Sequence, residues 1–186
     1  MHTLPPDVLA RHDFKVPNYI AASVEHIDFD ELEAAGIRHV VFDIDNTLTS
    51  FGESEVRRSI RAAMQTLRAR RSLDSLSLAT NSRRDVAHIF EAVQPDYLFQ
   101  AHGLVMKPRP RYYREVLERI GANPEHTIMI GDKLVQDVWG SRKVGMRAVL
   151  VKPLGKDFVF DSMFAVRLRE KLWLKSYLPR HPEHWF

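Results

Sequence analysis

The sequence has 186 residues, enough for one domain with a single hydrophobic core but a tight fit for two. It contains no apolar run of about 18 residues that would span a bilayer, and prolines and charges occupy the start, where a signal peptide needs its apolar stretch. We therefore expect a soluble, cytoplasmic protein, with peripheral contact to a membrane left open. The absence of cysteine excludes disulfides and thiolate metal sites, and the net charge of +3 mildly favours anionic partners.

The first element expected is a short helix within residues 27–36. Asp28 is placed to cap it, Glu31 completes a capping box, Ile27 can staple to Leu32, and Gly36 ends the helix. A strand over residues 40–42 should follow. The apolar spacing then changes to that of a helix within 53–70, so a strand followed by a helix is predicted.

The same alternation continues to residue 151. Strands are predicted at 75–80, 97–99, 126–130 and 146–151, and helices in the segments between them. One of these helices is expected to bury Val86, Phe90 and Val93. Alternating strands and helices predict an α/β fold: a mostly parallel, doubly wound sheet with helices on both faces, which is a Rossmann-like three-layer sandwich.

Polar side chains gather where the predicted strands end. Because ligands of such sheets bind beyond the carboxyl ends of the strands, these groups are expected to converge on one crevice. Crowded carboxylates repel one another, and burying them unpaired is costly, so a divalent cation is the simplest compensation. Magnesium suits an all-oxygen site that leaves positions for a substrate phosphate. The residues concerned are Asp43, Asp45, Thr47, Thr80, Asn81, Ser82, Lys107, Asp132, Lys133 and Asp137.

Four of these segments resemble a known family. DIDNT (43–47), TNS (80–82), KP (107–108) and GDKLVQD (131–137) are similar, in this order, to the four motifs of the haloacid dehalogenase (HAD) superfamily of phosphohydrolases. More narrowly, FDIDNTL, MKPRPRYY and IMIGDKLVQDVWGSRKVGMRAVLV resemble the subclass IIIA, YqeG-like phosphatases, which are related to mitochondrial phosphatidylglycerophosphate phosphatases. The superfamily resemblance covers about residues 37–151. It implies a HAD-like catalytic core there, with an N-terminal arm (1–36) and a basic aromatic tail (152–186) in a single domain of residues 1–186.

The resemblance also implies a role for each acid. Asp43 would be the nucleophile and a Mg²⁺ ligand. Asp45 would be the general acid and base, and would bind the metal through its backbone carbonyl. Asp132 would complete the metal shell, with Asp137 behind the ligands. The corresponding reaction is hydrolysis of a phosphomonoester through an aspartyl-phosphate.

The remaining motif residues would act on the phosphoryl group. Thr80 would hydrogen-bond it with help from the Asn81 amide, and Lys107 would neutralise the nucleophile and the phosphate. Simpler interpretations stay open: Asp43 and Asp45 as a turn or cap pair, Thr80 and Asn81 as turn formers, Lys107 as a surface residue with Lys133 as a rival for its role.

The spacing of the motifs leaves no room for an inserted lid domain, so a capless enzyme with an open crevice is expected. In this superfamily such an arrangement suggests a large substrate or a covering partner. The phosphorylated substrate proposed first is the lipid phosphatidylglycerophosphate. The alternative is a soluble phosphate ester or a nucleic-acid end, although nucleic acid is not favoured because no aromatic stacking platform is evident. A non-catalytic binding module on the same fold is a third, weaker reading, and the oligomeric state is not predicted.

The two ends of the chain are basic and aromatic. In the tail, Phe160, Phe164, Leu168 and Leu172 form one row, with Val166, Trp173 and Tyr177 opposite. Both docking onto the core or a sister subunit and contact with a membrane surface fit this pattern. The N-terminal residues likewise predict either an arm packed on the core or a surface anchor.

Overall fold

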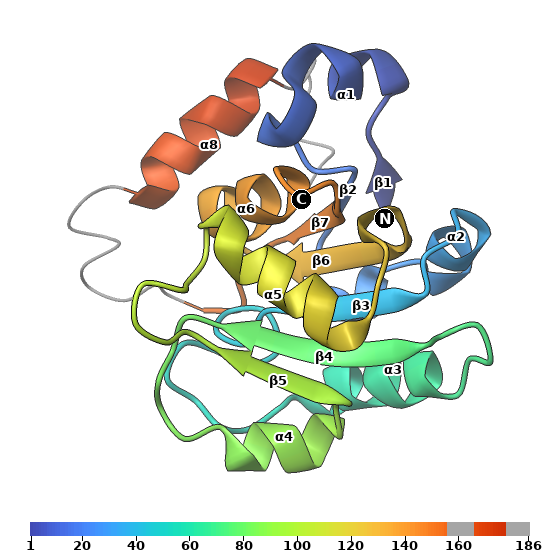
Figure 1. Cartoon of the computed structure of the whole chain (residues 1–186), viewed down its shortest axis with the longest axis vertical. Helices are drawn as coiled ribbons and strands as arrows, with labels where there is room; N and C mark the ends of the chain where they lie inside the picture. The colour runs from blue at the N-terminus through green and yellow to red at the C-terminus, as the bar shows by residue number, and fades with distance from the viewer. Residues whose placement is uncertain (156–165, 178–186) are drawn as a thin grey trace.

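The computed structural model describes residues 1–155 and 166–177 of the chain. Within them a seven-stranded sheet has the order β1-β2-β7-β6-β3-β4-β5 (Figure 1). Its strands are β1 (His2–Thr3), β2 (Tyr19–Ala21), β3 (His39–Phe42), β4 (Ser75–Thr80), β5 (Tyr97–Gln100), β6 (Thr127–Gly131) and β7 (Arg147–Val151). All pairings are parallel except that of β1 with β2. The mostly parallel sheet predicted from the alternation is confirmed.

Helices cover both faces of the sheet (Figure 1). They are α1 (Pro6–His12), α2 (Phe29–Ala34), α3 (Arg58–Arg68), α4 (Ala87–Val93), α5 (Pro110–Ile120), the π-helix η4 (Leu134–Trp139), α6 (Gly140–Arg142) and α8 (Val166–Tyr177), with short 3₁₀ turns at Asp13–Lys15, Val24–His26 and Pro124–His126. Successive residues of a strand point to opposite faces. Accordingly, Val40 and Phe42 join one apolar cluster with α3 and α4, whereas Val41 joins another with α5. The molecule thus has the three layers expected.

The chain reverses its winding direction at β3. From β3 it runs outward to β4 and β5, then returns to β6 and β7 on the other side of β3. The carboxyl ends of β3, β4 and β6 therefore lie together at the switch point, where α/β sheets bind their ligands. The segments between β3 and β4 and between β4 and α5 contain α3, α4 and β5, and no inserted lid domain is present in them.

Local predictions are largely confirmed. The side chain of Asp28 accepts a 3.0 Å hydrogen bond from the Glu31 amide at the start of α2. The predicted buried stripe of α4 was wrong at one position: Phe90 is 39% exposed, and Ile89 is buried in its place. Ile89 lies three residues after Val86 and four before Val93, so it continues that face of the helix.

The helix predicted within 53–70 begins later than expected. α3 starts at Arg58, and the extended backbone of Arg57 lets Val56 pack into the core from the preceding loop. Three arginines of this segment contact other protein groups. Arg57 and Arg61 donate to backbone carbonyls, and Arg68 pairs with Asp96.

The N-terminal arm packs on the core. It contributes β1, α1 and β2 to the edge of the sheet beside β7, and Leu4, Val16 and Ile20 are almost completely buried. No sequence pattern indicates these two strands, because β1 has two residues and β2 only three. β2 pairs with β7, which is distant in sequence, and β1 pairs with β2.

In the tail, the helix α8 docks onto the core. Leu174 is buried in the cluster of the N-terminal arm, and the Trp173 ring stacks on Trp139 with 5.1 Å between centroids. Leu168 and Leu172 are each 58% exposed on the outside of the helix. Phe160, Phe164 and the side chain of Val166 lie outside the described residues. No helix within residues 1–155 and 166–177 combines the length and apolar character needed to cross a membrane.

Candidate active site

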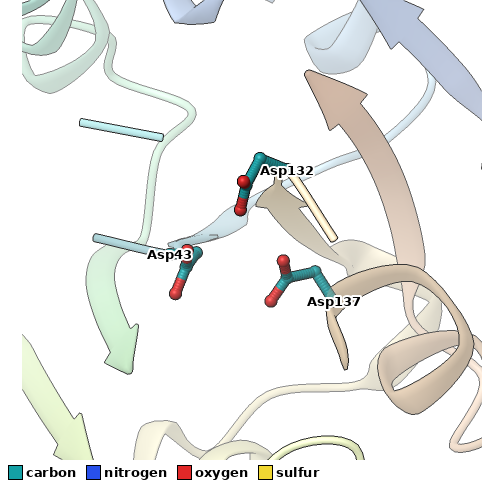
Figure 2. A group of neighbouring side chains, drawn as sticks. All are labelled: Asp43, Asp132 and Asp137. Atoms are coloured by element: carbon teal, nitrogen blue, oxygen red, sulfur yellow. The ribbon is translucent and has the colours of Figure 1, made fainter. Parts of the chain in front are cut away.

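Three buried carboxylates meet at the switch point. Asp43 directly follows β3, Asp132 directly follows β6, and Asp137 lies in η4. One carboxylate oxygen of each lies within 4.8 Å of the other two. Figure 2 shows the three side chains directed at a common space from these different parts of the chain. The convergence expected for Asp43, Asp132 and Asp137 is therefore present.

Lys107 inserts its ammonium group between two of these acids. Its Nζ lies 2.5 Å from Asp43 Oδ1 and 2.6 Å from Asp137 Oδ1, and its side chain is 1% exposed. Lys133, the rival at the sequence level, lines the neighbouring pocket, and its backbone amide donates to Asp137 Oδ2 at 2.9 Å. The geometry thus favours Lys107 over Lys133 as the cation that faces Asp43.

The Asn81 side chain holds the backbone of Lys107 in place. Its Oδ1 accepts from the Lys107 amide at 2.8 Å, and its Nδ2 donates to the Lys107 carbonyl at 2.9 Å and to Gln136 Oε1 at 3.2 Å. This two-point contact joins the end of β4 to the loop that carries the lysine, whose peptide bond to Pro108 is cis. Asn81 therefore positions Lys107 in this structure.

The close approach of Asp137 depends on a glycine. A Cβ atom at Gly131 would overlap the Asp137 carboxyl group. The absence of that atom lets the start of η4 fold back over the end of β6. The GD sequence at 131–132 thus provides both a ligand-type acid and the space that a second acid requires.

Burial raises the pKa values of two of these acids. Desolvation raises the pKa of Asp43 to about 6, although the nearby Lys107 ammonium opposes the rise. Burial also raises the pKa of Asp132 well above its usual range, against the effect of Arg167. Asp43 and Asp137 in turn keep the pKa of Lys107 above its ordinary value despite its burial. The site holds more negative charge than its lysine balances.

A pocket of about 280 Å³ opens beside the cluster. Its lining comprises Asp43, Asp45, Asn46, Phe51, Thr80, Asn81, Ser82, Lys133 and Gln136. Asp45 forms a 2.8 Å ion pair with Arg84, and it is not one of the three clustered acids. The Thr80 hydroxyl accepts a hydrogen bond from the Ser82 amide at 3.0 Å, so its own proton remains available to a ligand.

The carboxylates of Asp43, Asp132 and Asp137 are suitable ligands for a divalent cation such as Mg²⁺. All three groups offer carboxylate oxygens, the ligands that Mg²⁺ prefers. Asp132 Oδ1 is buried without a hydrogen-bond partner among the described residues. A buried oxygen without a partner is costly, and a bound cation would remove that cost.

Sequence reasoning named most of the residues assembled here but missed several. Phe51 and Gln136 line the pocket, and Arg167 on α8 contacts Asp132. Phe51 lies in an irregular loop and Arg167 in a tail with a mixed apolar pattern, so neither gave a periodic signal. Thr47 donates to Asp43 Oδ2 at 3.4 Å. The catalytic roles assigned to the motif residues stay predictions.

Comparison with known proteins agrees with this architecture. A family model described as HAD-hydrolase-like matches residues 105–155, which include Lys107, Asp132 and Asp137. Among solved structures, a HAD-superfamily hydrolase of subfamily IA, variant 1, from Geobacter sulfurreducens superposes with a TM-score of 0.50 at 15% identity, over 69% of this chain and 99% of that one. An uncharacterized protein from Listeria monocytogenes serotype 4b gives a TM-score of 0.53 at 13% identity, over 73% and 99% of the two chains. These likenesses show the fold.

Two curated relatives are phosphatases by name. The probable phosphatase YqeG of Bacillus subtilis is 20% identical over 159 residues, which cover 86% of this chain and 90% of YqeG. The phospholysine phosphohistidine inorganic pyrophosphate phosphatase of Xenopus laevis is 47% identical over 49 residues, or 26% of this chain, and the chain spans only 18% of that relative's length. The matches thus show a HAD-hydrolase-like segment at residues 105–155 and a fold shared with a solved HAD-superfamily hydrolase.

Proposed function

We propose that this protein is a Mg²⁺-dependent phosphomonoester hydrolase that works through an aspartyl-phosphate on Asp43. The observation that carries the proposal is the convergence of Asp43, Asp132 and Asp137 on one space, with Lys107 against two of them. The phosphatase names of the two curated relatives support the reaction class.

Asp43, Asp132 and the backbone carbonyl of Asp45 would hold the cation, with Asp137 in contact with Lys107 beside them. A bound Mg²⁺ would offset the buried carboxylates and the charge of the phosphate, and would polarise a phosphoryl oxygen. The pocket next to the cluster would receive the ester, with Phe51 and Gln136 on its walls.

In the first half of the reaction a carboxylate oxygen of Asp43 attacks phosphorus, and the bond between phosphorus and the ester oxygen breaks. The carboxyl group of Asp45 gives its proton to the departing alcohol oxygen. Lys107 and the Thr80 hydroxyl stabilise the charge that spreads over the phosphoryl oxygens. The Asp43 carboxylate must be ionised to attack, which its pKa of about 6 allows at neutral pH.

In the second half a water molecule attacks the phosphorus of the aspartyl-phosphate. Asp45, now a carboxylate, takes the proton of that water, and the bond between phosphorus and Asp43 breaks to release inorganic phosphate. Arg84, 2.8 Å from Asp45 Oδ1, would orient the Asp45 side chain at the wall of the pocket.

The test of the reaction is hydrolysis of a chromogenic phosphate ester with and without Mg²⁺. Asp43→Asn removes the nucleophile, and we expect at least a thousandfold loss of kcat. Arg111→Gln, an exposed change outside the pocket lining, is the control and should keep wild-type turnover. Equal activity of Asp43→Asn and wild type would refute the assignment of the nucleophile.

For the substrate we propose phosphatidylglycerophosphate first, as a member of the subclass IIIA, YqeG-like group would use. The match to YqeG over most of both chains supports that grouping, and a pocket without an inserted lid suits a bulky phospholipid head group. Turnover of this lipid in vesicles should be compared with a panel of soluble phosphate esters. A clear preference for a soluble ester would remove the lipid proposal.

Peripheral contact with a membrane through α8 belongs to the same proposal. The exposed Leu168 and Leu172 lie one turn apart, near the exposed Arg169, Lys171 and Lys175. Sedimentation with anionic vesicles should therefore fall when both leucines are changed to serine. Unchanged sedimentation would contradict this role of α8.

A further inference from the structure

One arginine of the helix α8 contacts the cluster of carboxylates formed by Asp43, Asp132 and Asp137. The Arg167 guanidinium donates to the carboxylate Oδ2 of Asp132 and to its backbone carbonyl. The Asp132 side chain is fully buried, and that of Arg167 is 23% exposed. Arg167 thus lies 35 residues beyond Asp132 in sequence, yet it contacts the acid at the end of β6.

Contacts made by Glu170 and Trp173 of α8 hold Arg167 in place. Glu170, one turn further along α8, is buried; its Oε2 lies 3.5 Å from Arg167 Nη1, and its Oε1 accepts from the Val135 amide at 2.9 Å. The stack of Trp173 on Trp139 ties the next turn of α8 to η4. Arg167 is therefore held by α8 and η4 while it grips Asp132.

The two oxygens of Asp132 have different surroundings. Oδ2 is engaged by Arg167, whereas Oδ1 is buried and has no hydrogen-bond partner in residues 1–155 and 166–177. A carboxyl group with one oxygen held and the other without a partner, next to Asp43 and Asp137, is oriented for a cation that would bind the free oxygen. Partners that hold the far oxygen of a ligating carboxylate are a general feature of metal sites.

The charges of the site favour the same interpretation. The three clustered carboxylates face two cations, Lys107 and Arg167. A divalent cation and a phosphate dianion would add charges that cancel each other, so the loaded site would stay close to neutral only with both cations present. Without Arg167 the excess negative charge would oppose the binding of phosphate.

We propose that Arg167 is a positioning residue that aims Asp132 Oδ1 at the divalent cation, which makes α8 an appended part of the metal site. This inference rests on the proposed function only in requiring that a cation binds at the cluster. It predicts that cation affinity depends on a helix that no HAD motif of this chain includes.

The test is the binding of Mn²⁺ to the full-length protein, followed by electron paramagnetic resonance, which requires no turnover. Arg167→Met should weaken Mn²⁺ binding about tenfold, at the low end of what losing such an outer partner costs. Arg167→Lys, which keeps a cation but loses the two-point contact, should recover part of the affinity. Arg169→Met removes the same charge from the exposed face of α8 and should bind Mn²⁺ within about twofold of wild type.

Two results for Mn²⁺ binding by Arg167→Met would each overturn the proposal. Tighter Mn²⁺ binding by Arg167→Met would mean that the guanidinium competes with the cation for Asp132. Unchanged binding would leave Arg167 with a packing role alone. A third comparison separates the guanidinium from the docking of α8. Trp173→Ala is expected to undock the helix; if Arg167→Met also undocks it, the loss of affinity follows from undocking, and the assignment of Arg167 is overturned as well.

The wild-type protein distinguishes this inference from the proposed function. If wild type itself binds no Mn²⁺ and hydrolyses no phosphate ester, the proposed function fails. If wild type binds Mn²⁺ and hydrolyses esters while Arg167→Met behaves like it, only the role of Arg167 fails. Near-ultraviolet circular dichroism of the Trp139–Trp173 pair reports in each variant whether α8 is still docked.

Discussion

The strand β3 has an ion pair at each end, and the two pairs differ in almost every physical respect. At the amino end Arg38 makes two hydrogen bonds to Asp74, of 2.7 and 3.0 Å, with both side chains about half exposed. At the carboxyl end Asp43 meets Lys107 with both side chains buried. One short strand thus has an ion pair at each end: the pair at the amino end is exposed to water, and the pair at the carboxyl end is buried.

The pKa values separate the two ends further. The hydrogen bonds from Arg38 lower the pKa of Asp74, so its environment favours the ionised form. Burial raises the pKa of Asp43 to about 6, so its environment disfavours ionisation even with Lys107 in contact. Perturbation by burial next to like charges is typical of functional sites. The amino end is arranged for stability, and the carboxyl end holds charges at a cost to stability.

The strongest test of this contrast is Lys107→Met. Removing one partner of a buried ionic cluster leaves the others uncompensated, so we expect the metal-free protein to lose about 3–5 kcal/mol of unfolding free energy at pH 7.5. Urea denaturation measures the loss, and Mg²⁺ should restore part of it because a cation can replace the ammonium charge. Lys152→Met, an exposed change, is the control. A loss below about 1 kcal/mol would contradict the view that Lys107 balances the cluster.

Asp43→Asn should raise the unfolding free energy of the metal-free protein, in contrast to Lys107→Met. Since the pKa of Asp43 in the folded protein, about 6, lies above the ordinary value of 3.8, ionisation destabilises the metal-free fold. That cost is absent below about pH 4, grows as the pH rises through 6 and reaches at most about 3 kcal/mol. The metal-free variant should therefore be more stable than wild type at pH 8 and nearly equal to it at pH 4, as urea denaturation across this range would show. A variant less stable than wild type at pH 8 would break the contrast.

Gly131→Ala tests whether the close packing of Asp137 at the carboxyl end of β6 requires a residue without a side chain at position 131. The added methyl group would overlap the Asp137 carboxyl group, so Asp137 must move and Lys107 loses a partner. We expect destabilisation of about 1–3 kcal/mol, as for other overpacked sites, together with weaker activity. In a double-mutant cycle, Asp137→Ala should relieve much of the overlap, so the two changes should not be additive. Strict additivity would place the damage elsewhere.

Some residues of this site could be predicted from sequence patterns, and others could not. Asp43, Thr80 and Asp132 lie at the ends of strands that periodicity and turn residues indicate, so their convergence was predictable from the fold class. The choice between Lys107 and Lys133 was not, because it depends on how the loop before α5 folds against Asn81.

Other features rest on contacts that sequence periodicity does not encode. Phe90 is exposed because the helix turns its Ile89 face inward, and both residues are apolar, so hydrophobicity alone did not decide between them. Arg167 reaches Asp132 only because Trp173 and Glu170 dock α8 onto η4. This packing between the tail and a π-helix distant in sequence cannot be predicted from local hydrophobic periodicity.

The smallest effect is expected at the amino ends of the strands, from Arg68→Gln. Arg68 donates two hydrogen bonds, of 3.1 and 3.3 Å, to Asp96, which precedes β5 and also accepts from the Leu76 amide. Both side chains of this pair are 36% exposed, so water and salt screen it, and its loss should cost about 0.2–1 kcal/mol. The cost should shrink further in 0.5 M salt, whereas the cost of Lys107→Met should persist there, because the buried cluster is screened far less. If denaturation curves showed the two losses falling in parallel with salt, burial would not be what distinguishes the two ends of the sheet.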